Sequence, residues 1–329
     1  MKPRVAVIGA GSFGRNHLRV IDQSEKAELA GVLDSDPARA DAAAETHHCH
    51  RFSSIDELVS DADAAVVATP TLTHRAIGCS LMEKGIDVLI EKPIADSVDA
   101  ARELVATAER SGRILQVGHL ERFNPAVIAL GKALKTPLFF EIHRLSEFSP
   151  RSLDVDVVLD LMIHDIDIVL ALTGQTPQEI QAAGIRILTP KVDIANVRLQ
   201  FASGCIANLT ASRVSTERVR KLRLFQPHEY ISLDYSRQEA VRFRVKPPMA
   251  IDFAPLTGPK DEPLKLELES FFDSVATRKV PVVTGGQGLA ALEVAQTILD
   301  RIEEHALLVA ATLRAAGETD AAGKAPDCT

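Results

Sequence analysis

One repeating pattern limits what the first third of this chain can fold into. A short apolar run rich in β-branched residues is followed by a turn and then by a segment with apolar residues at helical spacing. The runs are apolar throughout, as in strands buried on both faces of a parallel sheet. They occupy residues 5–9, 29–33, 64–68, 88–90 and 114–117. Before the last of them, a helix is expected over residues 97–111, which Ser97 can cap and Gly112 can end. Because right-handed crossovers join such strands, we predict a doubly wound parallel sheet of the Rossmann type.

A different pattern follows Pro125. Helices are expected over residues 155–172, 264–276 and 288–315. Extended stretches succeed one another without intervening helices at 196–201, 206–211, 221–225 and 231–235, and the Pro- and Gly-rich residues 247–263 are predicted to form a long surface loop. Successive strands favour a large, open, mainly antiparallel sheet. The predicted fold class is therefore α/β, with a Rossmann domain over 1–121, an α+β domain over 122–315 and a small, polar, disordered tail over 316–329.

The composition excludes several classes of protein. With 329 residues, of which 46% are hydrophobic and 25% charged, the chain has ordinary globular composition and room for two domains. A net charge of -8 without a long basic run argues against a nucleic-acid partner. No apolar run reaches the roughly 18 residues of a membrane span. Scattered cysteines and an apolar run that begins at Val5, too early for a signal peptide, favour a reducing cytoplasm.

The first apolar run ends in a glycine motif that points to a dinucleotide. The motif reads Gly9-Ala10-Gly11-Ser12-Phe13-Gly14. Its glycines allow a tight turn and close approach of a pyrophosphate to the start of the next helix. Asp34, at the end of the second run, can accept hydrogen bonds from the adenosine ribose and would repel a 2′-phosphate. Because Ser35 and Asp36 follow without an adjacent arginine, NAD is favoured over NADP.

Two polar segments follow later strands, at the edge where open α/β sheets bind ligands. Thr69-Pro70-Thr71 with His74 follows the third run, and Glu91-Lys92-Pro93 follows the fourth. An ammonium group at this edge can bind a substrate hydroxyl and stabilise the alkoxide formed as its proton leaves. The alternative is a solvated lysine paired with Glu91. Pro93 fixes the turn and is compatible with a cis bond.

Charged residues interrupt the apolar helix predicted over 155–172. Asp160 and His164 are four residues apart and are expected on one helical face, with Asp167 three residues further on. A histidine tuned by a neighbouring carboxylate can accept a hydroxyl proton near neutral pH. The alternative is a core histidine held by structural carboxylates.

A cluster of metal-ligand residue types, His47-His48-Cys49-His50, is interpreted as a polar surface turn. Adjacent side chains on an extended segment point to opposite faces, so they lack the spacing of a metal site. No metal site is predicted.

Together these motifs resemble the Gfo/Idh/MocA family of sugar and cyclitol dehydrogenases. The resemblance extends from the glycine motif through Asp34, the Thr-Pro and Glu-Lys-Pro segments and residues 118–125 to the helix with Asp160 and His164. It implies that Lys92 and His164 are the catalytic pair and that Asp160 contacts the substrate or the lysine. The residues then expected to bind the cofactor are Gly9, Gly11, Ser12, Phe13, Gly14, Asp34, Thr69, Pro70, His74, Glu91 and Lys92. Those expected to bind the substrate are Arg122, Asn124, Asp160 and His164.

The resemblance also bears on substrate and partners. Residues 118–125 and 159–168 look most like a bacterial subgroup that oxidises the 3-hydroxyl of UDP-N-acetylglucosamine for a partner aminotransferase in the biosynthesis of diamino-sugar lipid A. The alternatives are a myo-inositol or free-hexose dehydrogenase and, in another class, a non-catalytic NAD-sensing regulator. Family members pair through the open face of the second-domain sheet, which implies a homodimer or homotetramer.

Overall fold

The chain divides into two compact units. The computed structural model describes residues 2–149, 155–246, 248, 250–256, 258 and 260–315. The first unit comprises Met1–Phe123 and Asp261–Leu292, and the second comprises Asn124–Lys260 and Glu293–Thr329. Residues 261–292, which the sequence pattern assigns to the second domain, therefore belong to the first unit. The tail predicted over 316–329 lies outside the described residues.

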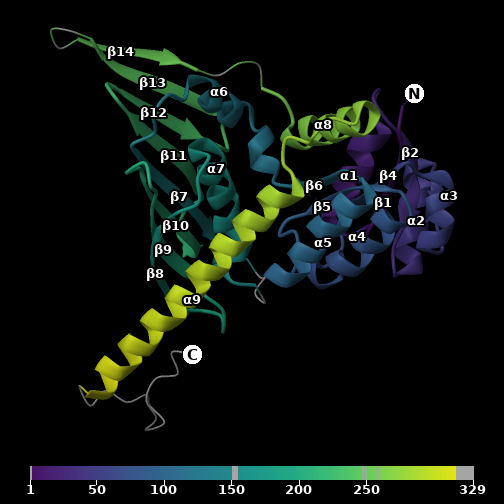
Figure 1. Cartoon of the computed structure of the whole chain (residues 1–329), viewed down its shortest axis with the longest axis horizontal. Helices are drawn as coiled ribbons and strands as arrows, with labels where there is room; N and C mark the ends of the chain where they lie inside the picture. The colour runs from purple at the N-terminus through teal and green to yellow at the C-terminus, as the bar shows by residue number, and fades with distance from the viewer. Residues whose placement is uncertain are drawn as a thin grey trace. The chain divides into compact units, whose positions relative to one another are not determined.

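The first unit contains the predicted doubly wound sheet (Figure 1). Its strand order is β3-β2-β1-β4-β5-β6, and every pair of neighbours is parallel. The five predicted apolar runs form five of these strands, and the sixth is the two-residue β3. The strands are β1 (Arg4–Ile8), β2 (Glu28–Leu33), β3 (His50–Arg51), β4 (Ala64–Val67), β5 (Asp87–Glu91) and β6 (Leu115–Gly118).

Local signals in the sequence determine where the helices of this unit begin and end. The Ser97 hydroxyl accepts a hydrogen bond from the amide of Ala100 and caps α5, and Gly112 ends that helix at φ 63°, both as predicted. Asp36 caps α2 in the same way. The helices are α1 (Ser12–Asp22), α2 (Pro37–His47), α3 (Ile55–Asp61), α4 (His74–Glu83), α5 (Val98–Ser111) and α8 (Pro263–Thr277), with short 3₁₀ turns η1 (Thr71–Thr73) and η2 (Leu120–Phe123).

Packing explains why α8 belongs to the first unit. Its buried Leu268, Phe271 and Phe272 share one core cluster with Val5 and Val7 of β1. Ion pairs between α1 and the start of α8, such as Arg19 with Glu262, add to this contact. Long-range packing of this kind leaves no local mark in the sequence.

The second unit is built on an eight-stranded sheet in the order β14-β13-β12-β11-β7-β10-β9-β8 (Figure 1). Only β7 and β10 pair in parallel, so the predicted mainly antiparallel sheet is confirmed. The strands are β7 (Phe139–Glu147), β8 (Glu179–Ile185), β9 (Ile194–Gln200), β10 (Ile206–Ser215), β11 (Val219–Gln226), β12 (Glu229–Asp234), β13 (Glu239–Lys246) and β14 (Ala250–Pro255).

The loop predicted over 247–263 is wrong in part, because it contains β14. This edge strand pairs only with β13, and its Ile251 and Phe253 are each 71% exposed. It therefore lacks the buried alternation by which strands are recognised in a sequence. Prolines at both ends of such a segment are compatible with an edge strand.

The helices of the second unit are α6 (Pro125–Ala133), α7 (Ile163–Thr173) and most of α9 (Gly285–Ala315). Figure 1 shows α6 and α7 on the same side of the sheet. Among the helices that the structure describes, none combines the length and the apolar character needed to cross a membrane.

The helix predicted over 155–172 is wrong in its first turns. Residues Val158–Met162 form a π-helical turn, η3, in which the amide of Ile163 bonds to the carbonyl of Val158. The α-helix begins only at Ile163 and ends at Gly174, in the left-handed conformation. Asp160 lies in this π-helical turn and His164 in the first turn of α7, and their placement on one helical face stays a prediction.

Candidate cofactor-binding and catalytic site

The glycine motif has the geometry that a bound dinucleotide requires. Gly9 has φ 97°, and a Cβ atom there would lie 2.5 Å from the carbonyl oxygen of Ala68. A Cβ atom on Gly14 would lie 1.7 Å from the carbonyl oxygen of Gly9. Gly11, the N-cap of α1, has nothing within 4 Å of such an atom and no side chain to cap the helix. The outer glycines thus allow tight packing, while the middle one leaves the helix start accessible to a phosphate.

Asp34 is bound to this motif. One of its carboxylate oxygens accepts a hydrogen bond of 2.6 Å from the amide of Ala10, and the other accepts one of 2.8 Å from the amide of Asp36. Its side chain is 6% exposed. The carboxylate is therefore fixed at the end of β2, where a ribose hydroxyl can reach it.

A pocket of about 860 Å³ joins these parts. Of the predicted cofactor-binding residues, its lining includes Gly9, Gly11, Ser12, Phe13, Asp34, Thr69 and Pro70. Gly14, His74, Glu91 and Lys92, all in described segments, lie outside this lining. The volume suits a small-molecule site, and the residues fit the adenosine and pyrophosphate parts of NAD.

Two arginines at the adenosine end were not anticipated. Arg39 and Arg51 both line the pocket. The guanidinium of Arg39 lies 3.3 Å from Asp34 and 3.1 Å from Asp36, and that of Arg51 lies 3.0 Å from Asp41. The sequence shows no arginine directly after Asp34, but α2 supplies Arg39 and β3 supplies Arg51 to the same pocket.

His74 connects two strand ends from inside the unit. It is buried, with Nε2 3.0 Å from the carbonyl oxygen of Thr69 and Nδ1 3.1 Å from that of Pro93. Burial lowers the pKa of His74. These contacts position the segments after β4 and β5, including the cis bond between Lys92 and Pro93.

Glu91, next to Lys92, is held by a histidine of α1. Nε2 of the fully buried His17 lies 2.7 Å from Oε1 of Glu91. Burial raises the pKa of Glu91, but the hydrogen bond with His17 and the charge of Lys92 outweigh it and hold the pKa below its usual value. Glu91 is thus an ionised partner beside Lys92, rather than a solvated surface carboxylate.

In the second unit, a buried ion pair fixes the helix that carries His164. Arg144 of β7 makes two hydrogen bonds, of 2.7 and 2.8 Å, to the carboxylate of Asp165, and its guanidinium lies 4.9 Å from the ring centre of Tyr235. His164 precedes Asp165 in the first turn of α7, and its side chain is only partly buried. Asp160 is also partly buried, within η3.

Two predicted substrate residues have structural contacts. Asn124 is buried, caps α6 through the amide of Ala126 and donates a hydrogen bond of 3.0 Å to the carbonyl oxygen of Tyr235. Its side chain is thus engaged in positioning α6. Arg122 reaches the carbonyl oxygen of Val282 at 3.4 Å.

The histidine-rich turn contacts carboxylates instead of converging on one point. His47 bonds to Asp22 and His50 to Glu57, while His48 ends α2 at φ 50°. Within the described residues, no group of three or more potential ligands is arranged to hold a metal ion.

Sequence reasoning missed His17, Arg39, Arg51 and Arg144. His17 lies beside Leu18 on the buried face of α1, and a buried histidine needs a partner. Arg144 lies on the same buried face of β7 as Phe140 and Ile142. Because a buried arginine needs a partner, a carboxylate on the apolar helix could have been sought. Arg39 lies five residues after Asp34, in the first turn of α2, whereas Arg51 reaches the pocket only through tertiary structure.

Comparison with protein families agrees with this geometry. Residues 3–119 match the model of the oxidoreductase family with an NAD-binding Rossmann fold, and residues 130–226 match the Gfo/Idh/MocA C-terminal domain.

The chain is similar to a UDP-N-acetylglucosamine 3-dehydrogenase from Acidithiobacillus ferrooxidans, with 34% identity over 91% of this chain and 97% of that protein. A solved structure named for that enzyme superimposes with a TM-score of 0.88 over 92% of this chain and 99% of that one. An inositol 2-dehydrogenase from Rhizobium meliloti is 27% identical over 92% of this chain and 98% of its own length. The chain therefore belongs to the Gfo/Idh/MocA family and is an NAD-binding oxidoreductase that acts on CH–OH groups.

Proposed function

We propose that this enzyme oxidises the 3-hydroxyl of UDP-N-acetylglucosamine to the 3-keto sugar. The observation that carries the proposal is the 34% identity to a UDP-N-acetylglucosamine 3-dehydrogenase over nearly the whole of both chains. The similarity extends through the second unit as well as the first. NAD, when bound, accepts the hydride that leaves the substrate carbon.

Lys92 and His164 are the proposed catalytic pair. The Lys92 ammonium would bind the hydroxyl oxygen and stabilise negative charge on it. The ionised Glu91 beside it favours the charged form of this lysine. His164 would accept the hydroxyl proton through its imidazole, with α7 fixed by the ion pair of Arg144 and Asp165. Asp160 and Arg122 are proposed substrate contacts.

A second candidate substrate is myo-inositol or a free hexose. The similarity to an inositol 2-dehydrogenase over 92% of this chain supports it. The catalytic residues would be the same, and only the ring that carries the hydroxyl would differ.

The proposed partners follow from the reaction. A 3-keto sugar nucleotide is suited to amination, so we propose an aminotransferase as the next enzyme, in diamino-sugar lipid A biosynthesis in the cytoplasm. We also propose a homodimer or homotetramer formed through the open face of the second sheet.

Formation of reduced nicotinamide tests the substrate. Protein saturated with NAD is mixed in parallel with UDP-N-acetylglucosamine, myo-inositol and glucose, and a 2-oxo acid is added in a second series to recycle tightly held cofactor. We expect turnover with UDP-N-acetylglucosamine, and loss of turnover in Lys92→Ala and His164→Ala with NAD binding retained. Turnover with myo-inositol or glucose alone would replace the proposed substrate and keep the catalytic residues.

A further inference from the structure

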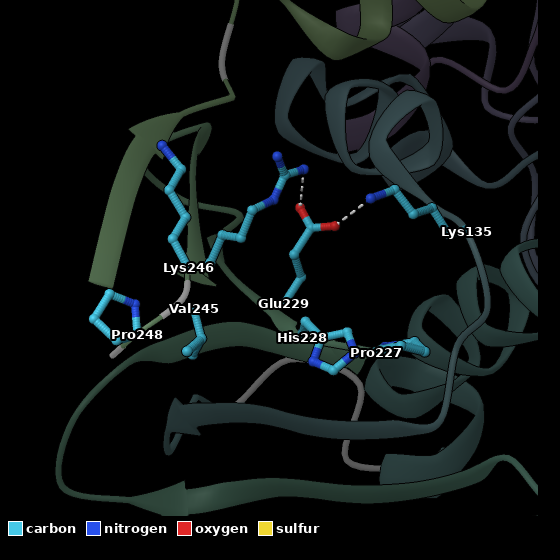
Figure 2. A pocket seen from close by; sticks show the side chains of 8 residues that line it. Lys135, Pro227, His228, Glu229, Val245, Lys246 and Pro248 are labelled. Atoms are coloured by element: carbon cyan, nitrogen blue, oxygen red, sulfur yellow. Dashed lines mark hydrogen bonds and ion pairs between the residues drawn. The ribbon is translucent and has the colours of Figure 1, made fainter. Parts of the chain in front are cut away.

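A second pocket lies at one end of the eight-stranded sheet, in the second unit. It has a volume of about 500 Å³ and is lined by Lys135, His228, Glu229, Arg244 and Lys246, together with Pro227, Val245 and Pro248. The segment after α6, the turn between β11 and β12 and the end of β13 meet here (Figure 2). We call it the Glu229 pocket.

Positive charge exceeds negative charge around Glu229. Its carboxylate, 2% exposed, lies 2.6 Å from the Lys135 ammonium and 3.0 Å from Arg244 (Figure 2). It also lies 3.4 Å from Arg242, which is outside the pocket lining. Burial raises the pKa of Glu229, but the bonds with Lys135 and Arg244 outweigh it and hold the pKa below its usual value. Lys135, Arg242 and Arg244 thus share one carboxylate, and Lys246 pairs with Asp252 at 2.8 Å, so cations outnumber carboxylates here in a chain whose net charge is -8.

The cations are held in place before any ligand arrives. Lys135 is bound at both ends: its amide donates to Oε1 of Gln226 at 2.9 Å, and its ammonium bonds to Glu229. The Gln226 side chain in turn donates to the carbonyl oxygen of Ala133. Arg244 lies opposite Glu229 in the register of β12 and β13. Yet the side chains of Lys135 and Arg244 are 59% and 36% exposed, so a ligand can reach them.

The turn of the pocket has an unusual residue. His228 has φ 61° and follows Pro227 in the two-residue connection from β11 to β12. Glycine or asparagine is the ordinary residue at this position of such a turn, because a side chain is strained there. A histidine in this conformation places an imidazole on the pocket wall, and strained residues cluster at ligand sites.

We propose that the Glu229 pocket binds small anions that contain a phosphate group. Arginine and lysine are the side chains that recognise phosphate, and here they outnumber the carboxylates around the pocket. The imidazole of His228 adds a donor on the same wall.

This site is separate from the proposed catalytic residues. Phe139, at the start of β7, pairs with Phe225 beside the pocket, whereas Arg144, which binds Asp165 of α7, lies five residues further along that strand. Five residues of a strand span about 17 Å. A bound phosphate would therefore not contact His164, and the proposal does not depend on the identity of the substrate.

Calorimetric titration of the full chain tests the proposal. The protein is first saturated with NAD, so that the glycine motif is occupied, and inorganic phosphate is then added at constant ionic strength. We expect saturable binding that weakens about tenfold in Arg244→Gln, as for the loss of one charged hydrogen bond. The control is Arg198→Gln, which removes an equal charge from β9 and should bind as the wild type does.

A second variant and a second ligand complete the test. His228→Gly removes the imidazole and relieves the turn, so it should fold at least as well and bind phosphate more weakly. Glycerol 3-phosphate, titrated in parallel, distinguishes a phosphate ester from the free ion by which of the two binds more tightly. Absence of saturable phosphate binding, or equal affinity in wild type, Arg244→Gln and His228→Gly, would overturn the proposal.

Discussion

At Asp34, a carboxylate that we propose selects for NAD lies beside an arginine that would suit NADP. Arg39 is 3.3 Å from Asp34, and Arg51 lines the same pocket. Asp34 forms an ion pair with Arg39 and would repel a 2′-phosphate, so we expect this carboxylate to favour NAD although two cations are close by.

Removing that carboxylate should reverse the cofactor preference. In Asp34→Ser, we expect NAD to bind about tenfold more weakly and NADP about tenfold more tightly, because a ribose contact is lost and Arg39 gains a phosphate partner. Dissociation constants from calorimetric titrations with NAD and NADP measure both. The double variant Asp34→Ser/Arg39→Gln should lose the gain in NADP affinity, and an undiminished gain there would exclude the arginine from this role.

The contact between His17 and Glu91 predicts a pH-dependent stability. The pKa of Glu91 in the native state lies below its usual value of about 4.3, so its ionised form stabilises the fold above that pH. This contribution is lost as the pH falls through the lowered pKa. His17→Leu removes the hydrogen bond that lowers the pKa of Glu91, while the burial that raises this pKa remains. The pKa therefore rises, and the ionised form becomes less favourable at neutral pH.

The stability difference between wild type and His17→Leu should thus be largest near neutral pH and should shrink as the pH falls toward 4. Urea unfolding at several pH values measures it. His17→Gln, which can still donate to Glu91, should recover part of the stability and of kcat, while the affinity for NAD stays unchanged in both variants. A pH-independent difference would mean that His17 acts only by filling space.

Among the elements, β7 and α7 depend on one buried ion pair. Arg144 and Asp165 are each 2% exposed and joined by two hydrogen bonds. Arg144→Met leaves a buried carboxylate without its main partner, which should cost about 3–5 kcal/mol of unfolding free energy.

The double variant Arg144→Met/Asp165→Leu removes both charges and should lose much less stability than the single variant. Urea unfolding of the wild type, both single variants and the double variant gives the coupling between the two side chains. Additive losses would show that the pair contributes no coupling energy.

The elements also show how far the sequence could be taken. Apolar runs and the caps at Ser97 and Gly112 are local, and the strands and helix they predicted are present. The π-helical turn at Asp160 has no such signal, because it differs from an α-helix by one bond register. The edge strand β14 also lacks a local signal, since both of its large apolar side chains, Ile251 and Phe253, are exposed.

In the candidate site too, features with local sequence signals were predictable and features that depend on distant contacts were not. The glycine motif and Asp34 were predictable because each residue acts close to its position in the chain. His17, Arg39 and Arg144 act on partners 74, 5 and 21 positions away, respectively, and two of these contacts depend on the fold.

For the whole molecule, an aromatic row on the second sheet bears on assembly. Phe139, Phe225, Tyr230, Phe243 and Phe253 follow one another across five neighbouring strands, with ring centres 4.9 to 6.4 Å apart. The residues that alternate with them, such as Phe140, Leu224 and Ile231, lie on the opposite face of the sheet and are buried. The row therefore gives the open face an apolar surface of the kind that a second copy would cover.

Replacing one exposed member of this row should weaken assembly. Phe253 is 71% exposed. In light-scattering measurements we expect an oligomeric wild type and a shift of Phe253→Asp toward monomer at the same concentration. Val280→Asp is the control, because Val280 is 80% exposed in the first unit. An unchanged mass for Phe253→Asp would mean that copies associate through another surface.

The most direct test of the central proposal follows the hydride itself. UDP-N-acetylglucosamine carrying deuterium at C3 is incubated with the enzyme and NAD, and NMR locates the label. We predict deuterium at C4 of the nicotinamide together with a 3-keto sugar, and no transfer with Lys92→Ala or His164→Ala. Unlabelled nicotinamide from NAD-saturated wild-type enzyme, or undiminished transfer in both variants, would contradict the account.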